Sequence, residues 1–522
     1  MATTSIYKTK IPVNAWIVLA ILGSITTMTI YAETMVIPAI PDLIKEFHIS
    51  YSMSSWILTA YLITAAIMTP IAGKLSDIYG KKKVLLIIMI IYAVGVSVAG
   101  FATNIYFMII SRAIQGIGMS SFPIAFSIVR DRFPREKMSI GNGVLSSMTA
   151  AGAVIGLIFG GSIIKDYGWQ ATFFTITPIA IALLITIRRF IHLENEQEEE
   201  GRGRRNRIEL PSIIRKENSN SDDKYRKRND IKTIDIKGAI TLAIAVTSFL
   251  LVLTYMQAGS NSTNSSSGVS VVGSTAQLES LVATGIVSLV LFTIIERRSE
   301  HPLIDFRLLL HKSILPSNLI ILIVGFLLFM VFQTISIMLR NPSPLGFGEN
   351  AVNVGNIMLP FALVFLVFGP LSGYIISKLG SLKPIIFGSI ITTVAFSSLL
   401  AFHSTEYSIS ANLAILAAGL SLNIVGVMNV VVLSTSKEYS GISLATTTLM
   451  RIVGSAIGPA LAGMYMQSNQ SIINIARVAQ YFPSTGSYNQ VFMTGILLSI
   501  VAIALAVVLR RNAVKMAIPN LV

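Results

Sequence analysis

The sequence predicts an all-α polytopic membrane protein with fourteen transmembrane helices, arranged as two six-helix bundles and two inserted helices. Of its 522 residues, 53% are hydrophobic and only 12% are charged, whereas soluble proteins carry about 25% charged residues. This apolar excess is too large for one soluble core. Fourteen apolar runs are each long enough, as a helix, to cross a bilayer. They lie at residues 14–38, 52–72, 84–103, 105–129, 139–164, 169–188, 236–258, 277–296, 315–339, 352–377, 384–403, 408–433, 441–466 and 489–510.

An internal repeat relates the two bundles. The segment PIAGKLSDIYGKKK at 70–83 is followed, 300 residues later, by PLSGYIISKLGSLK at 370–383, which keeps a proline, two glycines and a lysine. The glycine pair of 152–156 also recurs at 454–458. Two repeated halves with a site between them are typical of transporters. We therefore predict an N-terminal bundle at 1–188, a charged loop at 189–235, two inserted helices with linkers at 236–312 and a C-terminal bundle at 313–522.

The loop charges predict the orientation in the membrane. The net charge of +15 would indicate nucleic acid in a soluble protein, but here lysines and arginines gather in loops on one side of the membrane. Such loops are cytoplasmic, so we expect both termini in the cytoplasm, a location in the cell membrane and no nucleic-acid partner. The first run is expected to be a retained helix, because no small-residue cleavage site follows it.

The segment 189–235 is the only sizeable soluble stretch that the sequence predicts. It combines an acidic run at 194–200 with a basic cluster at 224–228 and has few apolar residues. Such a composition favours disorder or a surface-lying helix. We expect a solvated cytoplasmic tether, with contact to anionic lipids as the alternative.

The composition also excludes several kinds of chemistry. The chain has no cysteine and only five histidines, so it has no disulfide, thiolate metal site or cysteine nucleophile. No phosphate-binding loop, metal cluster or nucleophile–base pair is visible. We therefore predict a protein that is not an enzyme and uses no metal and no cofactor. We expect it to act as a monomer within the lipid bilayer.

Glu33 is the residue that least fits its surroundings. It lies in the apolar run at 14–38, where a carboxylate is costly and is usually kept for function. Thr26 and Thr29 lie seven and four residues earlier, so the three share one helical face. A low-dielectric site penalises the charged carboxylate, so Glu33 can carry a proton or neutralise a cation, but not easily both. We predict a proton-coupling role; the alternative is a glutamate at the outer membrane interface.

Two arginines and several polar residues complete the predicted site. Arg112 falls within the run at 105–129, where a guanidinium must face partners or water; a structural tie to backbone carbonyls is the alternative. Arg451 lies in the run at 441–466, and its role stays open. Candidates for substrate contact are polar residues in helices expected to line a cavity: Thr26, Thr29, Tyr61, Gln115, Gln333, Asn356, Asn423 and Asn429.

A glycine stripe runs along the helix predicted at 139–164. Gly152, Gly156 and Gly160 recur every fourth residue and share one face. Small residues at this spacing let helices approach closely in lipid. We expect this helix to pack against the helix at 352–377 of the other bundle, either as generic packing or as part of an antiport mechanism.

Residues 73–83, GKLSDIYGKKK, resemble the major facilitator superfamily. They match its loop signature, G-x-L-x-D-x-x-G-[RK]-[RK]-[RK], at every defined position. The residues that carry the match are Gly73, Asp77, Gly80, Lys81, Lys82 and Lys83. Glycine permits close packing and tight turns. The resemblance implies that this loop latches the two halves in the outward-facing state, whereas setting the topology is the simpler role for the lysines.

Four further stretches are similar to the fourteen-helix drug:proton antiporter branch of this family. They are YAETMVIP at 31–38, WILTAY at 56–61, RAIQGIG at 112–118 and the pattern G-x8-G-x3-G-L-x2-G-G at 143–161. The branch has Asp where this chain has Glu33, and Pro where it has Leu157. The resemblance implies that Arg112 takes part in proton coupling through its electric field on a nearby acid.

We predict a secondary active transporter that exchanges protons for amphipathic, often cationic, small molecules such as drugs. It is expected to export them by rocking its two halves about a central site. A first alternative is a transporter of a specific metabolite or organic anion bound by Arg112 and Arg451. A second alternative is a receptor or scaffold that acts through the loop at 189–235.

Overall fold

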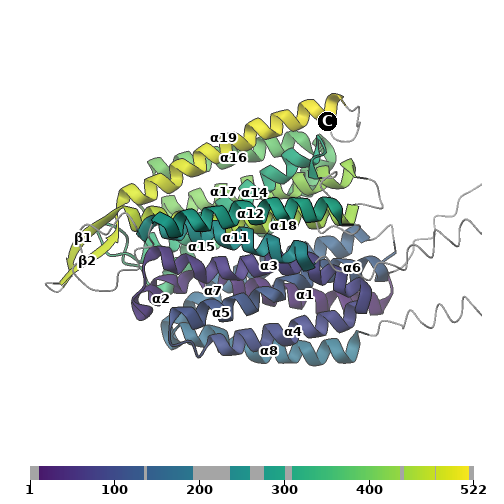
Figure 1. Cartoon of the computed structure of the whole chain (residues 1–522), viewed down its shortest axis with the longest axis horizontal. Helices are drawn as coiled ribbons and strands as arrows, with labels where there is room; N and C mark the ends of the chain where they lie inside the picture. The colour runs from purple at the N-terminus through teal and green to yellow at the C-terminus, as the bar shows by residue number, and fades with distance from the viewer. Residues whose placement is uncertain are drawn as a thin grey trace, which may run out of the picture.

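Long helices that run roughly parallel make up nearly all of the described chain in the computed structural model (Figure 1). The structure describes residues 11–134, 138–191, 236–258, 275–299, 309–435, 440–475 and 478–515. The loop predicted at 189–235 lies outside the described residues from position 192 onward.

The N-terminal half is the set of helices from α1 to α8. It consists of α1 (Val13–Thr34), the 3-10 turn η1 (Ile37–Ala39), α2 (Ile40–Phe47), α3 (Tyr51–Tyr79), α4 (Lys81–Ala99), α5 (Ile105–Gly116), the 3-10 turn η2 (Ile117–Ser120), α6 (Ser121–Arg132), α7 (Met138–Tyr167) and α8 (Trp169–Phe190).

The C-terminal half is the set of elements from α14 to α19. It consists of α14 (Ile314–Arg340), α15 (Ala351–Leu379), α16 (Leu382–Ala401), α17 (Glu406–Ser434), α18 (Ser440–Ser468), strands β1 (Gln470–Ile475) and β2 (Val478–Pro483), and α19 (Thr485–Lys515). The two strands pair antiparallel, with Gln470 opposite Pro483. We call the end of the bundle that carries them the hairpin end, and the end that carries Lys81–Lys83 the lysine end.

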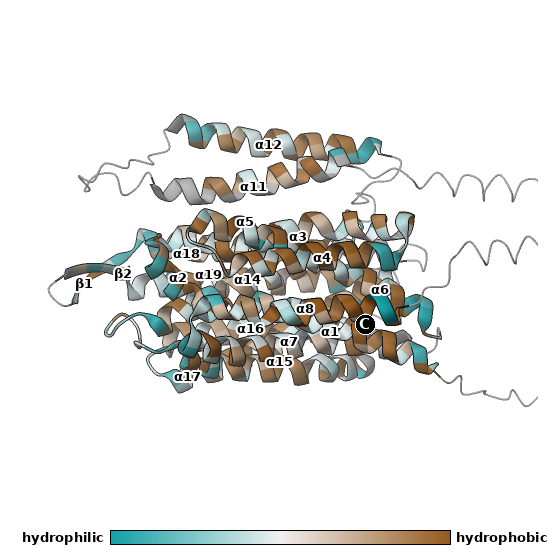
Figure 2. Cartoon of the chain, turned by 90° about the horizontal axis from the view of Figure 1, so that it is seen from below, coloured by the Kyte–Doolittle hydropathy of each residue, from teal (hydrophilic) through white to brown (hydrophobic). Residues whose placement is uncertain are grey.

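A pair of helices, α11 (Ile236–Ala258) and α12 (Thr275–Arg298), separates the halves in the sequence. The two pack against each other, and α11 also contacts α3 and α18, one helix from each half. Figure 2 shows the pair along one side of the bundle, with hydrophobic residues along the helices and hydrophilic ones gathered towards their ends. The inserted helices therefore border the junction between the halves.

Twelve helices in the described residues are long and apolar enough to cross a membrane. The prediction of a polytopic, nearly all-helical protein is thereby confirmed. Of the other two predicted spans, the one at 236–258 coincides with the 23-residue helix α11. The one at 105–129 is not a single helix, because η2 interrupts it between α5 and α6.

The interruption at η2 follows from close packing at two glycines. A Cβ atom on Gly116 would lie 2.2 Å from the carbonyl oxygen of Tyr61, and one on Gly118 would lie 2.3 Å from the ring of Tyr92. Only glycine, which has no Cβ atom, permits these close approaches. Glycine also lowers the stability of the helix that contains it. Pro123, in the first turn of α6, has no N–H to donate to the preceding turn. The apolar composition predicted the span but not this break.

The internal repeat is visible in the backbone. Gly80 and Gly380, 300 positions apart, both end a long helix with a positive φ, +90° and +75°. Pro70 and Pro370 both lie inside those helices, α3 and α15. Equivalent residues therefore shape equivalent helices in the two halves.

The halves are joined chiefly by α3 with α18 and by α7 with α15, and α14 also contacts α2 and η1. At the hairpin end they are in backbone contact, since a Cβ atom on Gly161 would lie 2.5 Å from the carbonyl oxygen of Ala351. Towards the lysine end, Cβ atoms on Gly73 of α3 and on Gly373 of α15 would meet no atom within 4 Å. The halves therefore approach each other most closely at the hairpin end.

The glycine stripe of α7 faces a different neighbour from the one expected. A Cβ atom on Gly152 would lie 2.5 Å from the carbonyl oxygen of Thr27, and one on Gly160 would lie 2.9 Å from Cα of Met35. The stripe thus packs α7 against α1 within its own half. The expected contact of α7 with α15 is present, but it is made by Leu157 and Gly161 on another face.

The same arrangement recurs in the second half and supports a stability prediction. A Cβ atom on Gly454 of α18 would lie 2.0 Å from the carbonyl oxygen of Leu322 in α14. We expect Gly454→Ala to lower the free energy of unfolding by about 1–3 kcal/mol, because backbone must move. The matched Gly373→Ala should leave stability unchanged or raise it slightly, since open space surrounds that position. Thermal unfolding in detergent measures both, and equal transitions would contradict this packing.

Candidate functional site

Three charged residues from both halves act on one another inside the membrane-spanning region. Glu33 of α1 is 5% exposed and Arg112 of α5 is fully buried, while Arg451 of α18 is half-buried. The guanidinium groups of Arg451 and Arg112 are the cations whose charge acts on the Glu33 carboxylate. Glu33 therefore lies inside the protein rather than on its surface. Its proton-coupling role stays a prediction, as does the alternative of a glutamate at the outer membrane interface.

Arg112 is held by the N-terminal half alone. Its Nε donates to the carbonyl oxygen of Ile57 at 3.0 Å, and one terminal nitrogen donates to that of Ala32 at 3.2 Å and to Oε1 of Gln115 at 2.9 Å. The guanidinium carbon lies 4.5 Å from the centre of the Tyr61 ring, a cation–π distance. The proposed structural tie to carbonyls is thus present, and it places the cation beside Glu33.

Gln115 helps to position this arginine. Gln115 comes one turn after Arg112, near the end of α5, and its Nε2 donates to the carbonyl oxygen of Gly95 at 3.1 Å. Gly95 is needed there, because a Cβ atom would lie 3.0 Å from the backbone nitrogen of Gln115. The side-chain amide of Gln115 therefore links the Arg112 guanidinium to α4 and holds α4 and α5 together.

The polar residues predicted near Glu33 in the first half do gather around the charges. The Tyr61 hydroxyl donates to the carbonyl oxygen of Thr29 at 3.3 Å. The Thr29 hydroxyl donates within its own helix, to Ile25 at 2.7 Å, and Thr26 is also buried. Thr29, Tyr61 and Gln115 thus belong to the cluster around Arg112 and Glu33.

The candidates from the second half lie elsewhere. Gln333 is buried in the contact between the halves, where its Nε2 donates to Oγ of Ser55 at 2.8 Å. Asn423 accepts from Ser389 at 3.1 Å, and Asn429 donates to Ser381 at 2.6 Å, so both tie α17 to α16. Asn356 is exposed on α15.

The signature at 73–83 is held within the N-terminal half. Lys81, at the start of α4, forms an ion pair with Asp131 near the end of α6. The Nζ of Lys82 donates to the carbonyl oxygen of Arg188 in the last turn of α8 at 3.1 Å, where a cation is favoured by the helix dipole. Lys83 is exposed, and the side chain of Asp77 lies outside the described part of the chain.

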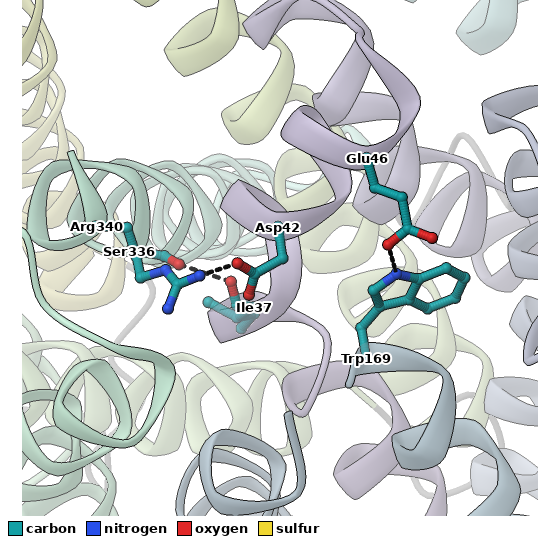
Figure 3. Close-up of polar contacts among 6 residues, drawn as sticks. All are labelled: Ile37, Asp42, Glu46, Trp169, Ser336 and Arg340. Atoms are coloured by element: carbon teal, nitrogen blue, oxygen red, sulfur yellow. Dashed lines mark hydrogen bonds and ion pairs between the residues drawn. The ribbon is translucent and has the colours of Figure 1, made fainter. Parts of the chain in front are cut away.

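Polar contacts close the junction between the halves at the hairpin end (Figure 3). Arg340 at the end of α14 forms an ion pair with Asp42 of α2, and the Ser336 hydroxyl donates to the carbonyl oxygen of Ile37 at 2.6 Å. Thr59 of α3 likewise donates to Ala456 of α18 at 3.0 Å. Sequence reasoning missed this closure; the signal that could have found it is Arg340, a cation on the side that carries few of them.

The carboxyl group of Glu33 can bind a proton or a cation, and charged residues of both halves act on it. Two repeated helical halves that meet at one end, with a buried acid and two arginines between them, are typical of a membrane transporter. The family model of the Major Facilitator Superfamily matches residues 22–459, and the chain belongs to this family. The predicted fold is thereby confirmed, and the chain is a transporter rather than an enzyme or a receptor.

Known proteins resemble the chain over most of its length. The multidrug transporter protein MdtP of Bacillus subtilis is 25% identical over 89% of this chain and 78% of its own length. The tetracenomycin C resistance and export protein of Streptomyces glaucescens is 24% identical over 86% and 74%. The crystal structure of the human organic anion transporter MFSD10 covers 94% of this chain and 99% of its own, with a TM-score of 0.59 and 15% identity. The last likeness concerns the fold alone.

Proposed function

We propose that this transporter exports amphipathic, often cationic, small molecules in exchange for protons. The observation that carries the proposal is the buried carboxyl group of Glu33, set at the junction between the halves with a cation on each side. A proton and a cationic substrate compete for one carboxylate. This competition couples the two fluxes, because the site releases one when it takes up the other.

The packing supports transport by alternating access. The halves are joined at the hairpin end, while Gly73 and Gly373 towards the lysine end face open space. The basic loops place the lysine end in the cytoplasm. The conformation described is then the one that opens inward, and a rocking motion would separate Asp42 from Arg340 and bring the lysine ends of the helices together.

The relatives support export as the direction. One is named a multidrug transporter and another a resistance and export protein. Exchange of one proton for one monovalent cation moves no net charge, so a pH difference of one unit, worth about 1.4 kcal/mol, supports at most about a tenfold gradient of the substrate.

Transport in proteoliposomes tests this function. A pH difference imposed across the membrane should drive a lipophilic cationic dye against its own concentration gradient, and a proton ionophore should abolish the accumulation. Dye that merely equilibrates, whatever the pH difference, would overturn the assignment.

Export of organic anions is the second candidate, and an unpaired donor on Arg112 favours it. Nε and one terminal nitrogen of Arg112 donate to carbonyl groups and Gln115, but the other terminal nitrogen is buried with no hydrogen-bond partner in the described residues, so Arg112 as well as Arg451 can receive an anion. The two candidates predict pH changes of opposite sign when the substrate binds. An anion at Arg451 would draw a proton onto Glu33, whereas a cation at Glu33 expels one. The direction of the pH change on substrate binding therefore separates them.

A further inference from the structure

A cavity of about 240 Å³, which we call the hairpin cavity, lies between the halves at the hairpin end. The N-terminal half contributes Lys45 of α2 and Tyr51 of α3, and the C-terminal half contributes Arg340 of α14, Gln467 of α18 and residues of both strands. The backbone N–H of Tyr51 donates to Oε1 of Gln467 at 3.2 Å, so the halves touch within the wall of the cavity. Any motion that parts the halves at this end therefore divides the lining.

The charged side chains that line the hairpin cavity are both cations. Lys45 is exposed and has no hydrogen bond or ion pair with the described residues. Arg340 uses one terminal nitrogen for Asp42, so its Nε and its other terminal nitrogen have no partner in the described part of the chain. Asp42 and Glu46 line a neighbouring cavity that shares only Arg340 with this one. Two cations with spare donors and no carboxylate favour an anionic ligand and disfavour a cationic one.

Aromatic side chains supply much of the remaining lining. Tyr51 of α3 and Phe482 of β2 are buried, whereas Tyr481 of β2 is 62% exposed and lies at the rim. Aromatic walls bind another ring through stacked or edge-to-face contacts. The volume is below the roughly 300–1,000 Å³ of sites for drug-sized ligands, so a single ring suits it. An arginine binds the oxygens of a carboxylate or a similar anionic group through parallel hydrogen bonds.

We propose that the hairpin cavity binds a small aromatic anion from outside the cell and thereby holds the carrier closed at the hairpin end. Because the ligand touches both halves, it binds the closed conformation and shifts the population towards it. At about 100 times its dissociation constant, it lowers the ratio of outward-open to outward-closed carrier about a hundredfold. Binding itself is independent of the proposed proton exchange, whereas inhibition rests on the proposed alternating access.

The binding test uses benzenesulfonate, which has one ring and stays ionised, with calorimetric titration of the purified protein. Lys45→Glu should weaken binding at least about tenfold, while Lys45→Arg should bind as wild type does. Lys165 is the matched control, because it is an exposed cation of the same half that lines only the neighbouring cavity. Lys165→Glu should leave the affinity within about twofold. Methanesulfonate, which has the charge but no ring, should bind at least about tenfold more weakly than benzenesulfonate.

The transport test adds benzenesulfonate to proteoliposomes on the side that the hairpin faces. The maximal rate of dye export should fall without a rise in the KM for the dye, and Lys45→Glu should need at least about tenfold more anion for the same loss. The inference is overturned if wild-type protein does not bind the anion, if Lys45→Glu and Lys165→Glu bind it alike, or if excess dye restores the full rate. The proposed function fails separately, if wild-type protein without the anion shows no accumulation driven by a pH difference.

Discussion

Glu33→Gln should abolish accumulation of a cationic substrate. Glutamine has nearly the same shape and stays neutral, so the variant resembles the protonated carrier at every pH, cannot exchange a proton and binds the cation poorly. With a pH difference of one unit imposed, the gradient should fall from as much as about tenfold to none. Dye accumulation in proteoliposomes at several pH values measures the effect.

The control for this variant is another carboxyl group, that of Glu46. Its side chain accepts hydrogen bonds from Trp169 and Gln170, the first of which is drawn in Figure 3, and Glu46 is not among the charges that act on Glu33. Glu46→Gln makes the same chemical change and should retain accumulation. If Glu33→Gln still builds a gradient with the pH dependence of wild type, the coupling role of Glu33 is wrong.

Linking Asp42 to Arg340 should stop transport. The two side chains form an ion pair between α2 and α14, in opposite halves, so a covalent bridge holds the hairpin end closed. The natural sequence has no cysteine, so two introduced cysteines are the only thiols that a cleavable bifunctional reagent can join. We expect Asp42→Cys with Arg340→Cys to lose at least about tenfold in transport rate once bridged, and to recover when the bridge is cleaved.

A matched bridge within one half provides the control. Asn469 donates to Gln490 at 2.8 Å, near the hairpin end but entirely inside the C-terminal half. Cysteines at these two positions should tolerate the same bridge with little change in rate. Normal transport by the Asp42–Arg340 bridged protein would show that this end does not open during the cycle.

The features that could be predicted from the sequence are those that depend on local sequence patterns. Apolar runs give the spans, and a segment repeated 300 positions later gives two related halves whose Gly80 and Gly380 take the same backbone conformation. The break at η2 escaped prediction, because it depends on the approach of Tyr61 and Tyr92 to two glycines. These contacts come from helices far apart in the sequence.

In the candidate site, too, the charged residues could be predicted from local patterns, whereas the contacts between helices could not. Glu33 and Arg112 stand out because charge is costly in a membrane, and the structure places both in the core. Asn423 and Asn429 have the same polar character, yet they bind neighbouring helices, because helical periodicity does not tell which helix a side chain will meet. The closure by Asp42 and Arg340 likewise depends on a pairing between halves that no local pattern contains.

Release of protons on substrate binding tests the central claim most directly. Purified protein in weakly buffered detergent solution, just acidic enough for Glu33 to hold its proton, should release roughly one proton for each lipophilic cation bound, because binding and ionisation at one carboxyl group are linked. The Glu33→Gln variant should bind the cation more weakly and release no proton. Equal release from both proteins, or uptake of protons by the wild type, would contradict exchange at Glu33.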